Sequence, residues 1–295
     1  MNSEAILKRL EWTVLKRLDG LLQGDYRTLY RGFGVDLADL REYQYHDDVR
    51  HIDWNVTARL QIPHVRQFVE DREVTAWFLV DLTESMQFGS GEKRKSEQMV
   101  EYIALLARIM TKHGNRIGAL VYRGGNSIAQ ILPAKNGRQQ VLQLIDLLNT
   151  RVESTNKSPT ELDQFFAKAG SILKRRSLVF VASDFISKAG WADALGHLAR
   201  RHEVVALRSE DALEAVMPDL GLITLQDSET GEQLLVDTHN KMFRDRFASL
   251  AAERKKQTET QLSRTGVDSL MIGRVDDLVA FAMRRRTHRR KQIAL

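Results

Sequence analysis

An apolar run that ends in an aspartate constrains the fold of this chain more than any other feature. Residues 74–80 read Val-Thr-Ala-Trp-Phe-Leu-Val and are dominated by β-branched and aromatic side chains. Such a run, ended by polar residues, is typical of a parallel strand that is buried on both faces. In open α/β sheets, ligands bind beyond the carboxyl ends of the strands, so Asp81 is expected at a ligand-binding edge.

From residue 74 onward, strand-like apolar runs alternate with segments of helical periodicity. The pattern predicts strands at 74–80, 117–122, 128–132, 178–183, 203–208 and 267–272. It predicts helices at 93–113, 137–150, 160–174, 190–201, 239–264 and 275–286. A hairpin is predicted from Leu222–Leu225 and Leu234–Val236, before the long helix. The alternation indicates an α/β fold with a mostly parallel sheet and helices on both faces.

The chain before residue 71 has a different character. An amphipathic helix is predicted over residues 4 to about 23, because apolar side chains recur there at spacings of three and four. Residues 24 to 70 are expected to be irregular or short-stranded. The predicted organisation is an N-terminal helix (1–25), a small irregular or β segment packed on the main domain (26–70), the main domain (71–286) and a basic tail (287–295).

The basicity of the chain is concentrated at its C-terminal end. The net charge is +5 and the pI is near 9.4, values that suit a nucleic-acid partner. Six cations, however, lie in the final twelve residues: Arg284, Arg285, Arg286, Arg289, Arg290 and Lys291. The rest of the chain carries about −1 (5 − 6). The main domain is therefore not expected to bind nucleic acid, and a nucleic-acid-associated factor acting through the tail is kept as an alternative.

Composition also bears on the compartment. The chain has no cysteine, which excludes disulfides and thiolate metal sites and fits a reducing cytoplasm. Charged residues interrupt the N-terminal region, unlike the apolar core of a signal peptide. No apolar stretch approaches the roughly 18 residues that a membrane span needs. We expect a cytoplasmic protein without a membrane span.

Oxygen-bearing side chains follow two of the predicted strands. Asp81, Thr83 and Ser85 come directly after the first strand, and Asp184 ends the strand at 178–183. Thr160 lies between them, near the start of a predicted helix. Carboxylates and hydroxyls are hard oxygen ligands, which suit Mg²⁺ better than zinc. The alternative is that these residues serve only as turn and helix-capping residues.

Taken together, these positions resemble the metal-ion-dependent adhesion site of von Willebrand factor A domains. That site is written Asp-x-Ser-x-Ser, then a loop threonine, then a strand-end aspartate. The matching residues are Asp81, Thr83, Ser85, Thr160 and Asp184, with Thr83 retaining the hydroxyl of the usual serine. The resemblance implies a Mg²⁺ site, with Mn²⁺ or Ca²⁺ as alternatives, at which an acidic residue of a partner completes the coordination.

A second resemblance involves residues 40–54 (LREYQYHDDVRHIDW) and residues 57–59 (TAR). They are similar to the signature of domain-of-unknown-function family fifty-eight, although His46 stands where that family usually has glycine. Members of the family often accompany MoxR-type AAA+ ATPases. The resemblance implies such an ATPase as partner, a protein client with an acidic docking residue, and a chaperone-like role in assembly or maturation of protein complexes.

The signature itself is interpreted as a structural collar. Arginines alternate in it with aspartates and glutamates, and aromatic side chains lie between them. This pattern favours ion pairs backed by aromatic packing over a second active site. Tyr43 and Trp54 are therefore predicted to be buried anchors, and Asp53 is expected to contribute to stability.

The sequence gives few indications of catalysis. Phosphotransferases of the haloacid-dehalogenase type place an aspartate nucleophile after the first strand and a second aspartate two residues later. Thr83 occupies that second position and cannot act as an acid or base near neutral pH. No P-loop, Gly-x-Ser-x-Gly or His-Glu-x-x-His motif occurs. A non-catalytic interaction module is expected, and a metal-dependent phosphohydrolase using Asp81 is the enzymatic alternative.

Overall fold

The computed structural model describes residues 4, 40–45, 49, 52–66, 74–91, 93–112, 114–125, 128–150, 160–227 and 231–272. The chain divides into two compact units, one comprising residues 1–17 and 75–281 and the other 18–74 and 282–295. Apart from Glu4, the predicted N-terminal helix lies outside the described residues, as do the predicted helix at 275–286 and the basic tail.

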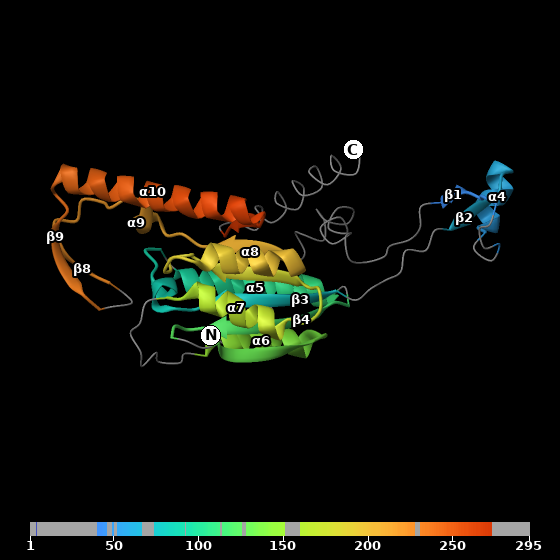
Figure 1. Cartoon of the computed structure of the whole chain (residues 1–295), viewed down its shortest axis with the longest axis horizontal. Helices are drawn as coiled ribbons and strands as arrows, with labels where there is room; N and C mark the ends of the chain where they lie inside the picture. The colour runs from blue at the N-terminus through green and yellow to red at the C-terminus, as the bar shows by residue number, and fades with distance from the viewer. Residues whose placement is uncertain are drawn as a thin grey trace. The chain divides into compact units, whose positions relative to one another are not determined.

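The larger unit is built on a six-stranded sheet in the order β10-β7-β6-β3-β4-β5 (Figure 1). The strands are β3 (Thr75–Asp81), β4 (Arg116–Tyr122), β5 (Ile128–Lys135), β6 (Leu178–Ser183), β7 (Glu203–Arg208) and β10 (Asp268–Met271). All neighbours are parallel except β4 and β5, which are antiparallel. The mostly parallel α/β sheet predicted from the alternating pattern is confirmed.

Helices cover both faces of this sheet. They are α5 (Lys95–Lys112), α6 (Arg138–Asn149), α7 (Leu162–Ile172), α8 (Trp191–Arg201) and α10 (Lys241–Thr265). On one face, α7 and α8 bury aromatic side chains against β3, β4, β6 and β7, and the Tyr122 ring stacks on Phe165 with centroids 5.1 Å apart. Helices α5 and α6 contact each other and β4. The central strands are therefore buried on both sides, as their continuous apolar sequences predicted.

The sheet reverses its direction of growth between β3 and β6. From β3 the chain adds β4 and then β5 on one side, and then returns to add β6, β7 and β10 on the other. The carboxyl ends of β3 and β6 thus flank a topological switch point, the place where open α/β sheets form their ligand crevices. Asp81 ends β3, and Asp184 follows β6 directly.

A hairpin and two short helices lie outside the sheet. The hairpin of β8 (Leu222–Gln226) and β9 (Gln233–Asp237) is present where it was predicted, before α10 (Figure 1). The 3-10 helix η3 (Glu84–Gln87) and the helix α9 (Ala212–Ala215) were not predicted, because a single turn has no periodicity to detect. Among the described residues, no helix combines the length and apolarity needed to cross a bilayer.

The smaller unit contains the family signature. Its strands β1 (Leu40–Glu42) and β2 (His64–Arg66) pair antiparallel, which confirms short strands in this region. Helix α4 (Trp54–Leu60) was not predicted. It starts because the buried carboxylate of Asp53 accepts hydrogen bonds from the backbone N–H groups of Asn55 and Val56, at 3.0 and 3.2 Å.

The prediction that Trp54 is a buried anchor is wrong. Its side chain is 70% exposed, whereas Tyr43 is half-buried. The reason is local: Trp54 is the first residue of α4, which has no buried residue of its own. In this segment Asp53, not the tryptophan, provides the buried anchoring contact.

Candidate metal centre

The first part of the site is the turn that follows β3. Asp81 is buried, and its Oδ1 accepts hydrogen bonds from the backbone N–H of Thr83 at 3.0 Å and from the Thr83 hydroxyl at 2.7 Å. The Thr83 hydroxyl lies 3.2 Å from the Ser85 hydroxyl. Three of the five predicted ligands are therefore joined directly. Spacing explains this grouping, because an aspartate that bonds the backbone two residues on forms a compact turn.

Two further contacts fix this turn on the sheet. The backbone N–H of Leu82 donates to the carbonyl of Tyr122 at 2.8 Å, which extends the pairing of β3 with β4 past Asp81. Helix η3 then starts at once, with the N–H of Met86 bonded to the carbonyl of Thr83 at 3.0 Å. Ser85 is thereby held at a buried position beside Asp81.

The second part of the site is the end of β6. The Ser183 hydroxyl donates to Asp81 Oδ2 at 2.7 Å and accepts from the N–H of Phe185 at 2.9 Å. The N–H of Ile186 donates to Asp184 Oδ1 at 3.0 Å. Ser183 therefore links the two strand ends, and it was not among the predicted site residues even though it directly precedes Asp184.

Phe185 has a backbone conformation that bulky residues rarely adopt. Its φ is +59°, in the left-handed region. The buried ring packs on Trp191 with centroids 4.9 Å apart, and this packing helps hold the conformation. Such strain clusters at functional sites. Here it shapes the turn that carries Asp184.

The third part of the site is the segment that precedes α7. Thr160 is buried, and its carbonyl accepts hydrogen bonds from the Ser187 hydroxyl at 2.9 Å and the N–H of Lys188 at 3.1 Å. The next residue, Glu161, donates its N–H to the Tyr122 hydroxyl at 3.0 Å. The structure thus ties the Thr160 segment to the loop after Asp184 and to the end of β4.

The electrostatics of Asp81 favour a cation. The pKa of the Asp81 carboxyl is raised from 3.8 to about 6, first by burial and second by the negative charge of Asp184. Hydrogen bonds from Ser183 and Thr83 lower it, but by less. Two carboxylates that repel each other in a buried site would be stabilised by a positive ion between them. This donor set fits Mg²⁺.

The composition of the donor set is mixed. No group of three or more histidine, aspartate or glutamate side chains able to hold a metal occurs within the described ranges. The edge of the sheet instead offers two carboxylates, Asp81 and Asp184. Further oxygen ligands would have to come from the hydroxyls of Thr83, Ser85 and Thr160, together with water.

A buried lysine at this edge of the sheet was also not among the predicted site residues. Lys95, the first residue of α5, is 1% exposed. Its Nζ donates to Asp184 Oδ2 at 2.8 Å and to Glu214 Oε1 at 2.6 Å. Burial alone would lower the pKa of Lys95, but the charge of Asp184 and the hydrogen bonds to both carboxylates outweigh it and raise the pKa. Asp184 is therefore already paired with a cation.

Glu214 belongs to a second set of contacts at this edge. It lies in α9, where its Oε2 accepts the backbone N–H of Asp211 at 3.0 Å and completes a capping box. Asp211 in turn accepts hydrogen bonds from the N–H and hydroxyl of Ser90 at 2.8 and 2.6 Å. The β3–α5 loop and the segment after β7 are thus joined at two points, Lys95–Glu214 and Ser90–Asp211.

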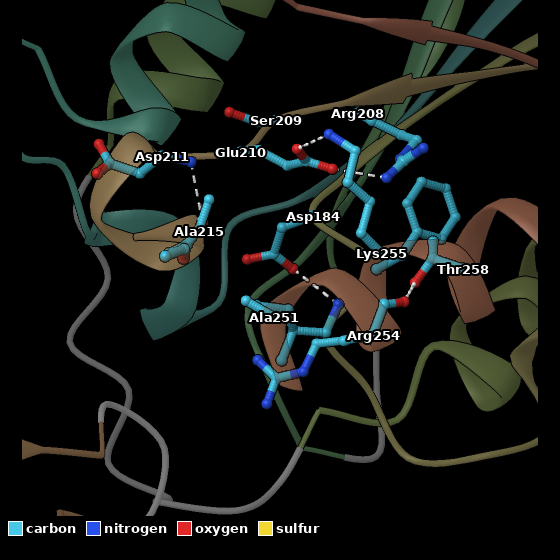
Figure 2. Close-up of a pocket in the computed structure, with 13 residues that line it drawn as sticks. Asp184, Arg208, Ser209, Glu210, Asp211, Ala215, Ala251, Arg254, Lys255 and Thr258 are labelled. Carbon is cyan, nitrogen blue, oxygen red and sulfur yellow. Dashed lines mark hydrogen bonds and ion pairs between the residues drawn. The ribbon is translucent and has the colours of Figure 1, made fainter. Parts of the chain in front are cut away.

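A cavity of about 70 Å³ adjoins Asp184 (Figure 2). It lies between the ends of β6 and β7, helix α9 and one side of α10. Glu210 pairs there with Arg208 at 2.6 Å and with Lys255 at 2.7 Å. A cavity of this size has room for water molecules. The Asp184 side of the site is therefore next to a cavity whose lining includes several charged side chains.

Solved structures that this chain resembles weakly include an aerotolerance-related membrane protein from Bacteroides fragilis. It has a TM-score of 0.46 and 16% identity, over 70% of this chain and 94% of that one. The conserved hypothetical protein BatB from Bacteroides thetaiotaomicron has a TM-score of 0.40 and 14% identity, over 65% and 98% of the two chains. The von Willebrand factor A-like fold of this chain follows from its own sheet topology.

Sequence comparison gives a closer relationship. Uncharacterized proteins of Mycobacterium tuberculosis and Mycobacterium bovis are each 34% identical over 289 residues, which is 96% of this chain and 89% of theirs. Residues 39–257 match the model of the family described as "Protein of unknown function DUF58". This match spans the signature, the switch point and most of α10, and the chain therefore belongs to the DUF58 family.

Proposed function

We propose that this protein is a non-catalytic interaction module that docks a partner protein through a Mg²⁺ ion at the Asp81–Asp184 edge. The observation that carries the proposal is the state of Asp81. It is buried, its pKa is raised by that burial and by the charge of Asp184, and it accepts hydrogen bonds from hydroxyls at the switch point of the sheet. A carboxylate in this setting is stabilised by a cation.

Each residue has a defined part in this proposal. Asp81 and Asp184 supply negative charge, while Thr83, Ser85 and Thr160 supply neutral oxygens. Ser183 orients Asp81 through its hydrogen bond to Oδ2. A Mg²⁺ ion with two carboxylates and neutral hydroxyls around it keeps enough positive charge to accept an acidic oxygen from a partner.

The proposed partner is a MoxR-type AAA+ ATPase, and the proposed setting is the cytoplasm. Membership of the DUF58 family and the likeness of residues 40–59 to its signature support the partner. The absence of cysteine from the sequence is compatible with the setting. The ATPase would perform mechanical work, and this protein would present a client with an acidic docking residue, in chaperone-like assembly or maturation of protein complexes.

The test is a pull-down of a MoxR-type AAA+ ATPase, in Mg²⁺ and in EDTA. Binding should be lost in EDTA and in Asp81→Ala, because both remove the docking ion. Asp146→Ala is the matched control, since it removes an exposed carboxylate from α6; it should bind as the wild type does. Binding that is indifferent to both EDTA and Asp81→Ala would show that the ion is not the docking point.

Turnover of a generic phosphoester in Mg²⁺ separates this function from a phosphohydrolase that uses Asp81. No turnover is expected, because both Asp81 oxygens accept hydrogen bonds and Thr83 stands where an acid or base would be needed. Turnover that disappears in Asp81→Asn would replace the docking proposal with a hydrolytic one.

A further inference from the structure

Lys95 places a positive charge beside Asp184, one of the two carboxylates of the candidate site. Its ammonium is buried at the start of α5 and spans two carboxylates, Asp184 at 2.8 Å and Glu214 at 2.6 Å. Asp184 is a predicted ligand of the metal, and Glu214 is not. Asp184 Oδ2 is thus already bonded to a cation that is part of the chain.

Glu214 is held independently of Lys95. Its Oε2 completes the capping box of α9 with the N–H of Asp211, and Asp211 is bonded to Ser90. Glu214 therefore keeps its position whether or not Lys95 also contacts Asp184. The flexible four-carbon stem of a lysine can follow one carboxylate when the other is taken away.

We propose that Lys95 is a built-in competitor of the divalent cation. In the metal-free protein its ammonium neutralises Asp184, and on metal binding it gives up Asp184 and stays on Glu214. This inference rests on the proposed Mg²⁺ docking site and adds its regulation. Lys95 would keep affinity for the ion low enough for binding to be reversible, and would couple occupancy of the site to α9 through Glu214.

The direction of the effect separates competition from a structural role. A structural lysine, when removed, leaves Asp184 and Glu214 unpaired and disturbs the site, so metal affinity falls. A competing lysine, when removed, frees Asp184 and removes a like charge beside the divalent ion, so metal affinity rises. Damage to a buried ion pair is expected to disturb the site, so tighter metal binding after removal of Lys95 would not be explained by structural damage.

The experiment is titration of the full-length protein with Mn²⁺, followed by electron paramagnetic resonance of the free ion. Lys95→Met should bind Mn²⁺ at least about tenfold more tightly than the wild type, since one unit of opposing charge is removed next to the ion. Lys93→Met is the matched control. It removes the same charge from the same segment, but Lys93 pairs with Glu101 at 2.7 Å, and its affinity should not change.

A second single variant, Glu214→Gln, and a charge-balanced double variant keep the proposal testable if Lys95→Met alone does not fold. Glu214→Gln keeps the Lys95–Asp184 pair and removes the anchor to which Lys95 withdraws, so it should bind Mn²⁺ about threefold or more weakly. Adding Lys95→Met to Glu214→Gln should then restore and exceed wild-type affinity. In this double variant the charge taken from Lys95 is offset by the charge taken from Glu214.

The outcomes distinguish the two proposals. If the wild type binds Mn²⁺ and Lys95→Met does not tighten binding, either alone or combined with Glu214→Gln, the competitor role is overturned while the docking site stands. If the wild type does not bind but Lys95→Met does, the competitor role is supported in its strongest form. If no variant binds Mn²⁺ at millimolar concentration, both the metal site and the role of Lys95 are refuted.

Discussion

Replacing Asp81 with asparagine should stabilise the metal-free protein, although it destroys the proposed ligand. In the folded protein the pKa of Asp81 is about 6 and in the unfolded chain it is near the ordinary 3.8. The stability contributed by a carboxyl of this kind is fully present below the unfolded pKa and is lost as the pH rises through about 6. Asparagine is neutral at every pH and avoids this loss.

The size of the effect follows from the pKa difference. A rise from 3.8 to about 6 is 2.2 units, which corresponds to about 3 kcal/mol at about 1.36 kcal/mol per unit. An amide accepts fewer of the hydrogen bonds from Thr83 and Ser183, so the net gain should be about 1–3 kcal/mol. For a folded unit of this size that is a rise in Tm of about 5 °C.

Thermal unfolding in EDTA measures the effect. At a pH of about 7.5, Asp81→Asn should have a higher Tm than the wild type. The difference in Tm should disappear as the pH falls to about 4. Saturating Mg²⁺ should reverse the order, because only the wild type gains stability from the ion. Asp146→Asn is the control for loss of a surface carboxylate and should leave Tm unchanged. If Asp81→Asn has a lower Tm than the wild type in EDTA, or if the difference in Tm does not depend on pH, the buried charge of Asp81 does not destabilise the metal-free protein.

Three further predictions concern the neighbouring charges and the smaller unit. Asp184→Asn should lower stability by about 2–3 kcal/mol in urea, opposite in sign to Asp81→Asn, because it leaves the buried Lys95 with one partner; equal effects of the two substitutions would contradict this. Mn²⁺ affinity should fall as the pH drops below about 6, since a proton then competes for Asp81; a flat pH profile would exclude Asp81 as a ligand. Asp53→Ala should destabilise α4 by about 1 kcal/mol, seen as faster amide exchange there, by removing its N-cap; unchanged exchange together with lost partner binding would make the signature an interface.

Much of the larger unit could be predicted from sequence because its elements carry strong periodicity. The central strands are continuous apolar runs, and the observed β3 and β6 each lie within one residue of the prediction. What was missed is short: α4 and α9 are each started by a capping aspartate. Such caps depend on a few hydrogen bonds and leave no repeating pattern in the sequence.

In the candidate site, too, the residues that are close in sequence were predicted, and a residue that is distant in sequence was missed. Asp81, Thr83 and Ser85 group together through contacts only two residues apart, so spacing alone predicted them. Lys95 lies 89 residues from Asp184, and in the sequence it stands in a Lys-Arg-Lys run that resembles a solvated helix start. Only the folded chain brings Lys95, at the start of α5, to Asp184, which follows β6.

The most direct test of the central claim is anomalous diffraction from crystals grown with Mn²⁺ as a substitute for Mg²⁺. A single strong peak is expected at the carboxyl edge of the sheet, with the Ser85 and Thr83 oxygens bound to the ion directly at about 2.1 Å or through one water molecule. Asp81 should lie in the same shell, and Lys95 should bond Glu214 alone. Crystals at millimolar Mn²⁺ with no peak between β3 and β6, and with Lys95 still on Asp184, would contradict it.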